Sequence, residues 1–375
     1  MTGAMYAAIA GLKSHMNKLN VIGNNTANVN TYGYKAGRAT FQESLYTSIR
    51  SGTDGTAQIG GNNPAQIGYG CNMGAINVDM STGTLVPTGY NLDCMIDGGG
   101  FFLVGGKPTV GADGEMGHVD PNSLYLSKVG EFSFDSDGYL VDNYNNVVYG
   151  FVPRTGAAGA ESEPGALADV NKPEISTQLV PIRLPLQAKR PENDTDPVEG
   201  SAIYPGVDAD GRNVYDQGGD ADSVSNGKTI GCQMDSISIS KTGVITGSND
   251  ADGSRVVIGY LAMGSVPNPS GLTHINGSYY QAQEGAGDVA VNSFGDVLNG
   301  KYLDNVQGAD IDDDNPGIPI YGSGSELLSG FLEGSGTDVA TEFTEMITTQ
   351  RGYQANTRII TVTDAMLEEL VNIKR

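Results

Sequence analysis

The chain has 375 residues, enough for two or three domains with a sizeable buried core. Its 21 basic and 44 acidic residues give a formal net charge of -23, which argues against binding to nucleic acid or to an anionic membrane surface. Glycine is abundant, at 54 residues, which indicates many turns, and the 3 cysteines are too few and too widely spaced for a disulfide framework or a thiolate metal site.

The N-terminal end carries a short apolar stretch. No Lys or Arg precedes it, since the first basic residue is Lys13, so we expect no cleaved signal peptide. No apolar run approaches the roughly 18 residues that a transmembrane helix needs, so we expect no membrane insertion.

A heptad-like stripe of apolar residues runs along the first thirty residues. Its members recur at steps of four and three, the spacing of one face of a helix, here from about residue 3 to residue 29. The stripe consists of Met5, Ile9, Leu12, Met16, Leu19 and Ile22.

A second amphipathic helix is predicted at the other end of the chain. Residues 335–338 offer capping side chains, and the helical pattern continues to about residue 374. The apolar residues at helical spacing are Phe343, Met346, Ile347, Ile359, Val362, Met366, Leu370 and Ile373.

Between the helices the pattern changes to strands and turns. Residues 132–141 and 237–245 both read as a strand, a Gly turn and a second strand, which predicts two hairpins of similar design. The expected fold class is mainly β with α-helical termini. The expected parts are a β-rich domain formed by 71–152 and 231–300, an inserted outer subdomain or elaborated loop at 153–230, and an insertion or linker at 301–335.

The terminal helices are marginal on their own. Six stripe side chains contribute about 9–18 kcal/mol when buried, whereas ordering the backbone of some 27 residues costs about 27–54 kcal/mol, only partly offset by hydrogen bonds. We therefore expect 1–30 and 339–375 to order only against each other and against neighbouring subunits. The alternative is a single intramolecular helix pair docked on the β-rich body.

Two stretches at the chain ends carry a family resemblance. Residues 19–35, LNVIGNNTANVNTYGYK, strongly resemble the N-terminal signature of bacterial flagellar rod and hook proteins. Residues 342–356, EFTEMITTQRGYQAN, and the final LVNIKR resemble the other end of the same family. Internal stretches at 91–102, 130–132 and 236–272 also resemble it, and within the family the hook subunit is favoured over the distal rod subunit.

The resemblance implies a structural, non-enzymatic role. Hook subunits polymerise into a curved tube that passes motor torque to the filament as a universal joint, and their terminal helices pair as an inner coiled coil that lines the export channel. For this chain it implies a coiled-coil domain made of 1–30 and 336–375, a linker at 31–70 that contacts neighbours, and no cofactor. It places the chain in the extracellular flagellum.

The implied partners are other copies of the chain, together with rod, hook cap and hook-filament junction proteins and the flagellar type III export apparatus. The implied assembly residues are the two apolar stripes together with signature residues. At the N-terminal end these are Asn24, Asn25, Asn28, Tyr34 and Lys35, and at the C-terminal end they are Gln350, Arg351 and Tyr353.

Candidate chemistry is poorly supported by the sequence. The three histidines, His15, His118 and His274, lack metal-ligand spacing, and the acidic stretches at 208–211 and 310–314 lack the pattern of an EF-hand loop. No nucleophile has an identifiable base partner, so no catalytic residue and no metal ligand are predicted. The competing hypothesis from another class is a secreted acidic β-rich adhesin or surface enzyme.

Overall fold

The computed structural model describes residues 2–55, 60–107, 119–153, 175, 177, 179–184, 186–188, 203–204, 229–231, 234–249, 255–295, 298–303 and 318–373. The chain divides into two compact units. Unit 1 comprises Met1–Met80 and Ser335–Arg375, and unit 2 comprises Ser81–Gly334. The predicted subdomain at 153–230 and the acidic stretch at 310–314 fall mostly or wholly outside the described residues.

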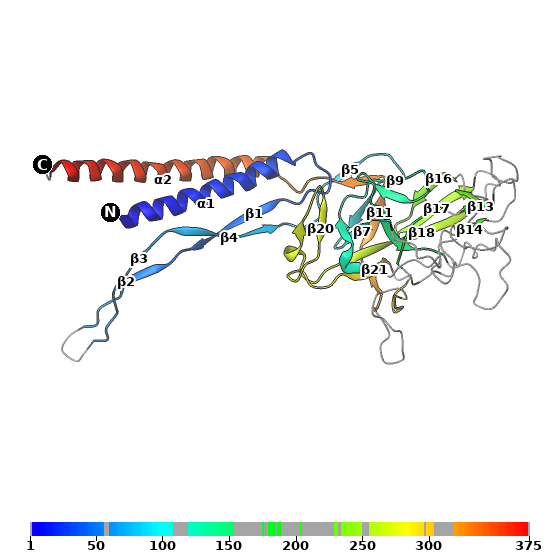
Figure 1. Cartoon of the computed structure of the whole chain (residues 1–375), viewed down its shortest axis with the longest axis horizontal. Helices are drawn as coiled ribbons and strands as arrows, with labels where there is room; N and C mark the ends of the chain where they lie inside the picture. Colours follow the sequence, from blue (N-terminus) through cyan, green and yellow to red (C-terminus); the bar gives the residue numbers. More distant parts are fainter. Residues whose placement is uncertain are drawn as a thin grey trace. The chain divides into compact units, whose positions relative to one another are not determined.

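Unit 1 contains the two terminal helices and four strands (Figure 1). These are α1 (Thr2–Ala27), β1 (Gly37–Glu43), β2 (Tyr46–Arg50), β3 (Ala65–Gly68), β4 (Cys71–Val78) and α2 (Val339–Ile373). Asp338 caps α2, because its carboxylate accepts hydrogen bonds from the backbone N–H of Ala340 at 3.1 Å and from the Thr341 hydroxyl. The predicted terminal helices are thus confirmed.

The segment expected as a linker, 31–70, contains strands. β1 pairs with β4, and β2 pairs with β3, both antiparallel, so the segment forms a hairpin-like arm. Apolar and polar residues alternate within 37–43, so that Ala39 and Phe41 share a face, and this alternation is the sequence signal for β1.

Unit 2 is built of strands, as the predicted fold class requires. They are β5 (Leu85–Pro87), β6 (Cys94–Asp97), β7 (Phe101–Gly105), β8 (Tyr125–Ser127), β9 (Phe132–Phe134), β10 (Leu140–Asp142), β11 (Val147–Phe151), β12 (Val180–Pro181), β13 (Leu186–Ala188), β14 (Ile203–Tyr204), β15 (Thr229–Gly231), β16 (Met234–Ile239), β17 (Val244–Asn249), β18 (Arg255–Ser265), β19 (Thr273–His274), β20 (Tyr279–Gln281), β21 (Ala290–Phe294), β22 (Tyr321–Ser323), β23 (Glu326–Ser329) and β24 (Phe331–Glu333), with 3-10 turns at Pro121–Ser123 and Pro269–Gly271.

The long strand β18 organises the main sheet of unit 2. It pairs antiparallel with β17, β11, β7 and β21 along its eleven residues, nine of which are buried in succession. A run that is apolar on both faces is typical of a strand covered on both sides. The core around it includes Phe102, Val104, Phe132, Leu140, Val148, Ile182, Ile245, Ile258, Leu261, Met263, Phe294 and Leu327.

Three hairpin turns in unit 2 share one design. In each turn the backbone N–H of the first residue donates to the carbonyl of the fifth residue. The side-chain oxygen of the first residue accepts a hydrogen bond from the backbone N–H of the fifth. The turns are Asp135–Tyr139, Asp142–Asn146 and Ser240–Val244. The fourth residue adopts a positive φ of 80°, 62° and 77°, in Gly138, Asn145 and Gly243 respectively. The two predicted hairpins are confirmed, and the third was missed because Asn replaces Gly at its left-handed position.

Gly130 provides a test of the packing in unit 2. Its carbonyl accepts the N–H of Cys94 at 2.9 Å, and a Cβ at this position would overlap the Cys94 carbonyl oxygen. We expect Gly130→Ala to destabilise unit 2 by about 2–3 kcal/mol, because backbone must move. The chain lacks Trp, so urea unfolding followed by Tyr fluorescence reports the buried tyrosines.

Gly106→Ala is the matched control, because nothing lies within 4 Å of a Cβ placed there. An equal shift of the urea midpoint in both variants would show that the approach of Gly130 to Cys94 is not the cause.

Candidate assembly surface

The two terminal helices of unit 1 pack antiparallel against each other (Figure 1). A Cβ on Gly11 would lie 2.8 Å from the Asn356 amide, and one on Gly352 would lie 2.7 Å from the His15 ring. Lys18 forms an ion pair with Glu345 at 3.1 Å. These contacts run in opposite directions along the two helices, and the two glycines allow the backbones to approach closely.

The contact between the helices, called the helix seam from here on, is largely polar. Its contacting residues are spaced by three, four or seven positions on each helix. On α1 they are Gly11, His15, Lys18 and Asn25, and on α2 they are Glu342, Glu345, Gly352 and Asn356. The seam therefore follows a heptad-like spacing with few large apolar side chains.

The apolar stripes predicted from the sequence lie mostly beside the seam. Nine of their residues are 45–80% exposed: Ile9, Met16, Phe343, Ile347, Ile359, Val362, Met366, Leu370 and Ile373. Met5, Leu12, Leu19 and Met346 are half-buried, and Ile22 is buried. The pairing within the chain thus leaves most of the apolar surface of the helices uncovered.

Asn25 joins three parts of unit 1. Its side chain is 2% exposed, donates to Glu342 Oε1 at 2.8 Å and to the Gly37 carbonyl at 2.9 Å, and accepts from the Gly37 N–H and the Tyr34 hydroxyl, both at 3.0 Å. All four hydrogen-bonding positions of the amide are therefore used. Asn25 connects the end of α1, the turn before β1 and the start of α2.

The other signature residues stand around this contact. Asn24 is exposed and donates to the Tyr34 hydroxyl at 3.0 Å, and Asn28 donates to the Asn24 carbonyl at 2.9 Å. Lys35 is 3% exposed. Of the C-terminal signature residues, Tyr353 is half-buried, whereas Gln350 and Arg351 are exposed.

His15 is a seam residue that the sequence analysis did not assign a role. Its ring lies edge-on to Phe41 of β1, with the centroids 5.6 Å apart, and its Nδ1 atom is buried without a hydrogen-bond partner among the described residues. Burial, followed by the charge of Lys18, lowers the pKa of His15 below its ordinary value of 6.5. The ring is therefore neutral at pH 7.

The β2–β3 arm presents a further apolar surface that the sequence analysis did not identify. Leu45, Ile49 and Ile67 are 80%, 65% and 51% exposed. Tyr46 and Tyr69 are exposed as well. An isolated two-stranded hairpin is marginal in water, so this surface is suited to contact with another molecule.

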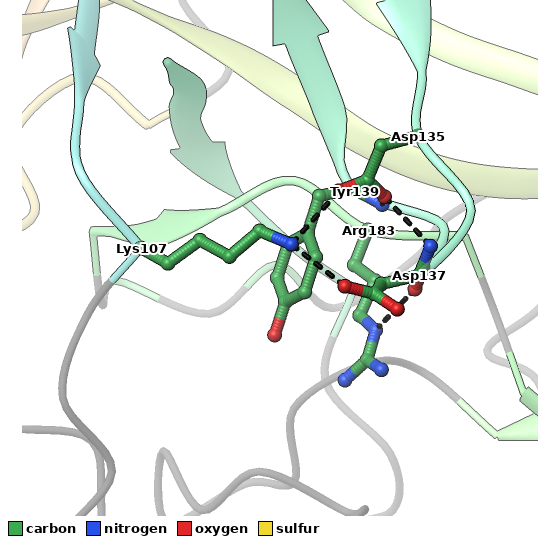
Figure 2. A network of polar contacts seen from close by, with 5 residues as sticks. All are labelled: Lys107, Asp135, Asp137, Tyr139 and Arg183. Carbon is green, nitrogen blue, oxygen red and sulfur yellow. Dashed lines mark hydrogen bonds and ion pairs between the residues drawn. The ribbon is translucent and has the colours of Figure 1, made fainter. Parts of the chain in front are cut away.

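Unit 2 contains one conspicuous charged cluster, which Figure 2 shows. Lys107 Nζ lies 2.8 Å from Asp135 and 2.7 Å from Asp137, two carboxylates of the β9–β10 turn. The hydrogen bonds to these carboxylates raise the pKa of Lys107. Tyr139 lies between two cations, with Lys107 Nζ 4.9 Å and the Arg183 guanidinium 4.6 Å from its ring centroid.

This arrangement is structural. The ammonium group fills the position between the carboxylates, and Arg183 donates to the Asp137 carbonyl at 3.2 Å, so the cluster fastens the turn to the segment after β12. Within the described part of the chain, no group of three or more His, Cys, Asp and Glu residues could hold a metal ion. Among the described helices, none is long and apolar enough to cross a membrane.

Comparison with known proteins gives matches at both ends and along the whole chain. The family described as "Flagella basal body rod protein" matches residues 5–35, and the family described as "Flagellar basal body rod FlgEFG protein C-terminal" matches residues 328–373. The flagellar basal-body rod protein FlgG of Bacillus subtilis is 30% identical over the full length of both chains.

Hook proteins are also similar over their whole length. The flagellar hook protein FlgE of Borreliella burgdorferi is 24% identical over all of both chains, and that of Salmonella typhimurium is 25% identical over 98% of this chain and 99% of its own. Among solved structures, the flagellar hook protein FlgE2 of Helicobacter pylori aligns with 66% of this chain and 100% of its own, at 11% identity and a TM-score of 0.30.

Replacing Asn25 by Asp tests the contact at the end of α1. The new carboxylate loses both donors and faces Glu342 and the Gly37 carbonyl, so we expect a destabilisation of the seam by about 2–4 kcal/mol at pH 7. The loss should diminish below about pH 4, where carboxyl groups become protonated. Circular dichroism at 222 nm during urea unfolding measures it.

Asn24→Asp is the control, since it adds the same charge one residue earlier at an exposed position. If both variants lost the same stability, a general charge effect at the helix end would explain the result and the role of Asn25 would be refuted.

The cluster of Figure 2 predicts unequal effects of its two cations. Arg183 is 6% exposed, so we expect Arg183→Met to lower the unfolding free energy of unit 2 by about 2–3 kcal/mol. The Lys107 side chain is 45% exposed, and Lys107→Met should cost about 1 kcal/mol or less. Calorimetric melting of both variants measures the two losses of unfolding free energy. A larger loss for Lys107→Met than for Arg183→Met would contradict the greater structural role of Arg183.

Proposed function

Since the chain belongs to the family of flagellar basal-body rod and hook proteins, we propose that it is a hook subunit that polymerises through its terminal helices into a curved tube. The family is one of structural proteins, and its members form homopolymers in the bacterial flagellum. The flagellum is therefore where this chain acts, and the hypothesis of a secreted adhesin or surface enzyme is set aside.

The observation that carries the proposal is the position of the apolar stripes. Nine side chains of the two stripes are at least 45% exposed, although the two helices already pack against each other. Contiguous exposed apolar surface marks interaction sites. Identical chains that join through two different patches form rings when the rotation closes and helical assemblies when it does not, so packing of the stripe on another patch of the next copy would build a tube.

The finer parts of the role follow from the proposal. In a hook, the paired terminal helices would line the central channel, and the assembled tube would pass torque from the motor to the filament. The partners would be the rod, the hook cap, the hook-filament junction and the flagellar type III export apparatus, with export independent of a cleaved signal peptide. The exposed arm at 44–70 would contact neighbouring subunits.

The distal rod remains the alternative within the family. It is supported by the rod protein FlgG of B. subtilis, which is 30% identical over 376 aligned residues, close to the length of this chain. The hook is supported by full-length relatives named as hook proteins in several bacteria. The shape of the polymer separates the two, because a hook is curved and a rod is straight.

Electron microscopy of the concentrated protein, with a variant of the stripe, tests the proposal. We expect curved tubes from the natural chain and none from Ile359→Asp combined with Val362→Asp. Two lost apolar contacts remove about 3 kcal/mol or more per subunit contact, which raises the critical concentration about 100-fold. Because both residues are exposed, helix content and melting temperature should stay unchanged.

The matched control is Gln354→Asp, which adds a charge at an exposed position of α2 outside the apolar stripe. It should still form tubes. Tubes from the double variant would refute the stripe as the assembly surface, and straight tubes from the natural chain would assign the rod.

A further inference from the structure

The polypeptide passes between the two units twice, after Met80 and after Gly334. On the unit 2 side of these passages, β5 and β24 pair antiparallel and form a two-stranded sheet. Residues 83–87 and 331–334 are called the crossing ribbon from here on. The two segments that lead into unit 1 therefore leave unit 2 from neighbouring strands. A two-stranded ribbon is marginal in water, so its side-chain contacts decide whether it stays closed.

Glu333 fastens the crossing ribbon from β24. The residue is 1% exposed, and its Oε1 atom accepts a hydrogen bond from the backbone N–H of Gly83 at 2.6 Å. A hydrogen bond between a carboxylate and a backbone N–H is charge-assisted and stronger than one between neutral groups. Beside it, the N–H of Gly334 donates to the Thr84 carbonyl at 2.7 Å. Side chain and backbone thus hold the two strands together up to the last residue of unit 2.

Two glycines allow the strands to approach this closely. A Cβ on Gly83 would overlap the carbonyl oxygen of Gly334. A Cβ on Gly334 would lie 2.6 Å from the hydroxyl oxygen of Thr84. Any larger residue at position 83 would therefore force the two backbones apart and separate the Gly83 N–H from Glu333.

We propose that Glu333 is a positioning residue for assembly, which keeps the crossing ribbon closed and so holds the two segments that lead into unit 1 side by side, whether or not α1 and α2 are paired. The closed ribbon keeps the loop from the end of β4 to the start of α2 short. If the ribbon opened back to the next hydrogen bond, from the Thr88 N–H to the Gly330 carbonyl, this loop would be about twice as long. Bringing its ends together would then be about threefold less favourable.

The consequence for assembly rests on the proposed function. A subunit is added to a tube when both of its terminal segments are in place, and the closed ribbon presents the two segments as a pair. Opening the ribbon should therefore slow the growth of tubes about threefold, although it removes none of the apolar stripe residues.

Hydrogen exchange of the full chain, followed by mass spectrometry below the concentration at which it polymerises, tests the proposal. We expect peptides that contain 83–87 and 331–334 to be protected in the natural chain. Glu333→Ala should raise their exchange rate at least about tenfold, because a buried, charge-assisted hydrogen bond to the backbone is lost. Glu333→Gln retains an acceptor oxygen and should keep most of the protection.

Glu326→Ala is the matched control. Glu326 lies in the neighbouring strand β23 with a 63% exposed side chain and a long ion pair to Lys241, at 3.8 Å, so its removal should leave the ribbon protected. Unchanged exchange in Glu333→Ala, or equal acceleration in both variants, would overturn the proposal. Rapid exchange of the ribbon in the natural chain would overturn it as well.

A second pair of variants keeps Glu333 and acts on the backbone contact. Gly83→Ala should open the ribbon, whereas Gly99→Ala should not, because nothing lies within 4 Å of a Cβ at Gly99. This pair decides the proposal if Glu333→Ala does not fold, which urea unfolding of unit 2 followed by Tyr fluorescence would show. Protection retained in Gly83→Ala would overturn the proposal.

The growth of tubes provides a separate readout. At equal protein concentration, Glu333→Ala should elongate tubes about threefold more slowly than the natural chain, and Glu333→Gln should elongate them at nearly the natural rate. An open ribbon with growth at the natural rate would overturn the role in assembly. Failure of the natural chain to form tubes at all would refute the proposed function, whereas hydrogen exchange would still decide whether Glu333 closes the ribbon.

Discussion

The close, polar contact between α1 and α2 is the constraint on which the rest of unit 1 depends. Gly11 and Gly352 remove the side chains that would separate the helices, and Asn25 uses its whole amide to tie α1 to α2 and to the turn before β1. A buried amide with all its partners specifies one register, because a shift along the helix would leave several groups unsatisfied. The seam therefore sets the alignment of the helices, while contributing little apolar burial.

This use of polar residues decides what the apolar residues do. If the stripes had faced each other, the helix pair would be self-sufficient and its outer surface polar. Instead Ile9, Ile359 and Val362 stay about half exposed. Apolar surface that the two helices do not bury against each other is available for burial against other copies of the chain. A monomer with such a pair is marginal, and in the proposed polymer each added neighbour would stabilise it.

The sequence allowed much of the fold to be predicted. The terminal helices and two hairpins follow from periods of 3.6 and 2 residues, and the residues named as apolar stripes lie on those helices. The partner of a stripe was beyond such reasoning, because amphipathicity shows which face avoids water and not what covers it. The seam residues could not be recognised, since Gly11, Gly352 and His15 read as weak helix formers until they are seen opposite each other. Strand β1 was missed because the whole of 31–70 was expected to be a linker.

A polar seam also fits a subunit that must reach its place before it assembles. Large apolar contacts between helices are hard to open, because each square ångström of apolar surface exposed to water costs about 25 cal/mol. The contacts of Asn25, Lys18 and His15 are exchanged for contacts with water when the helices part, so their net contribution is small. The helix pair can therefore open without a large barrier in the free chain, and in the proposed tube it would become firmly held once neighbouring copies cover Ile359, Val362 and the rest of the stripe. In this way the same sequence combines an easily opened monomer with a stable polymer.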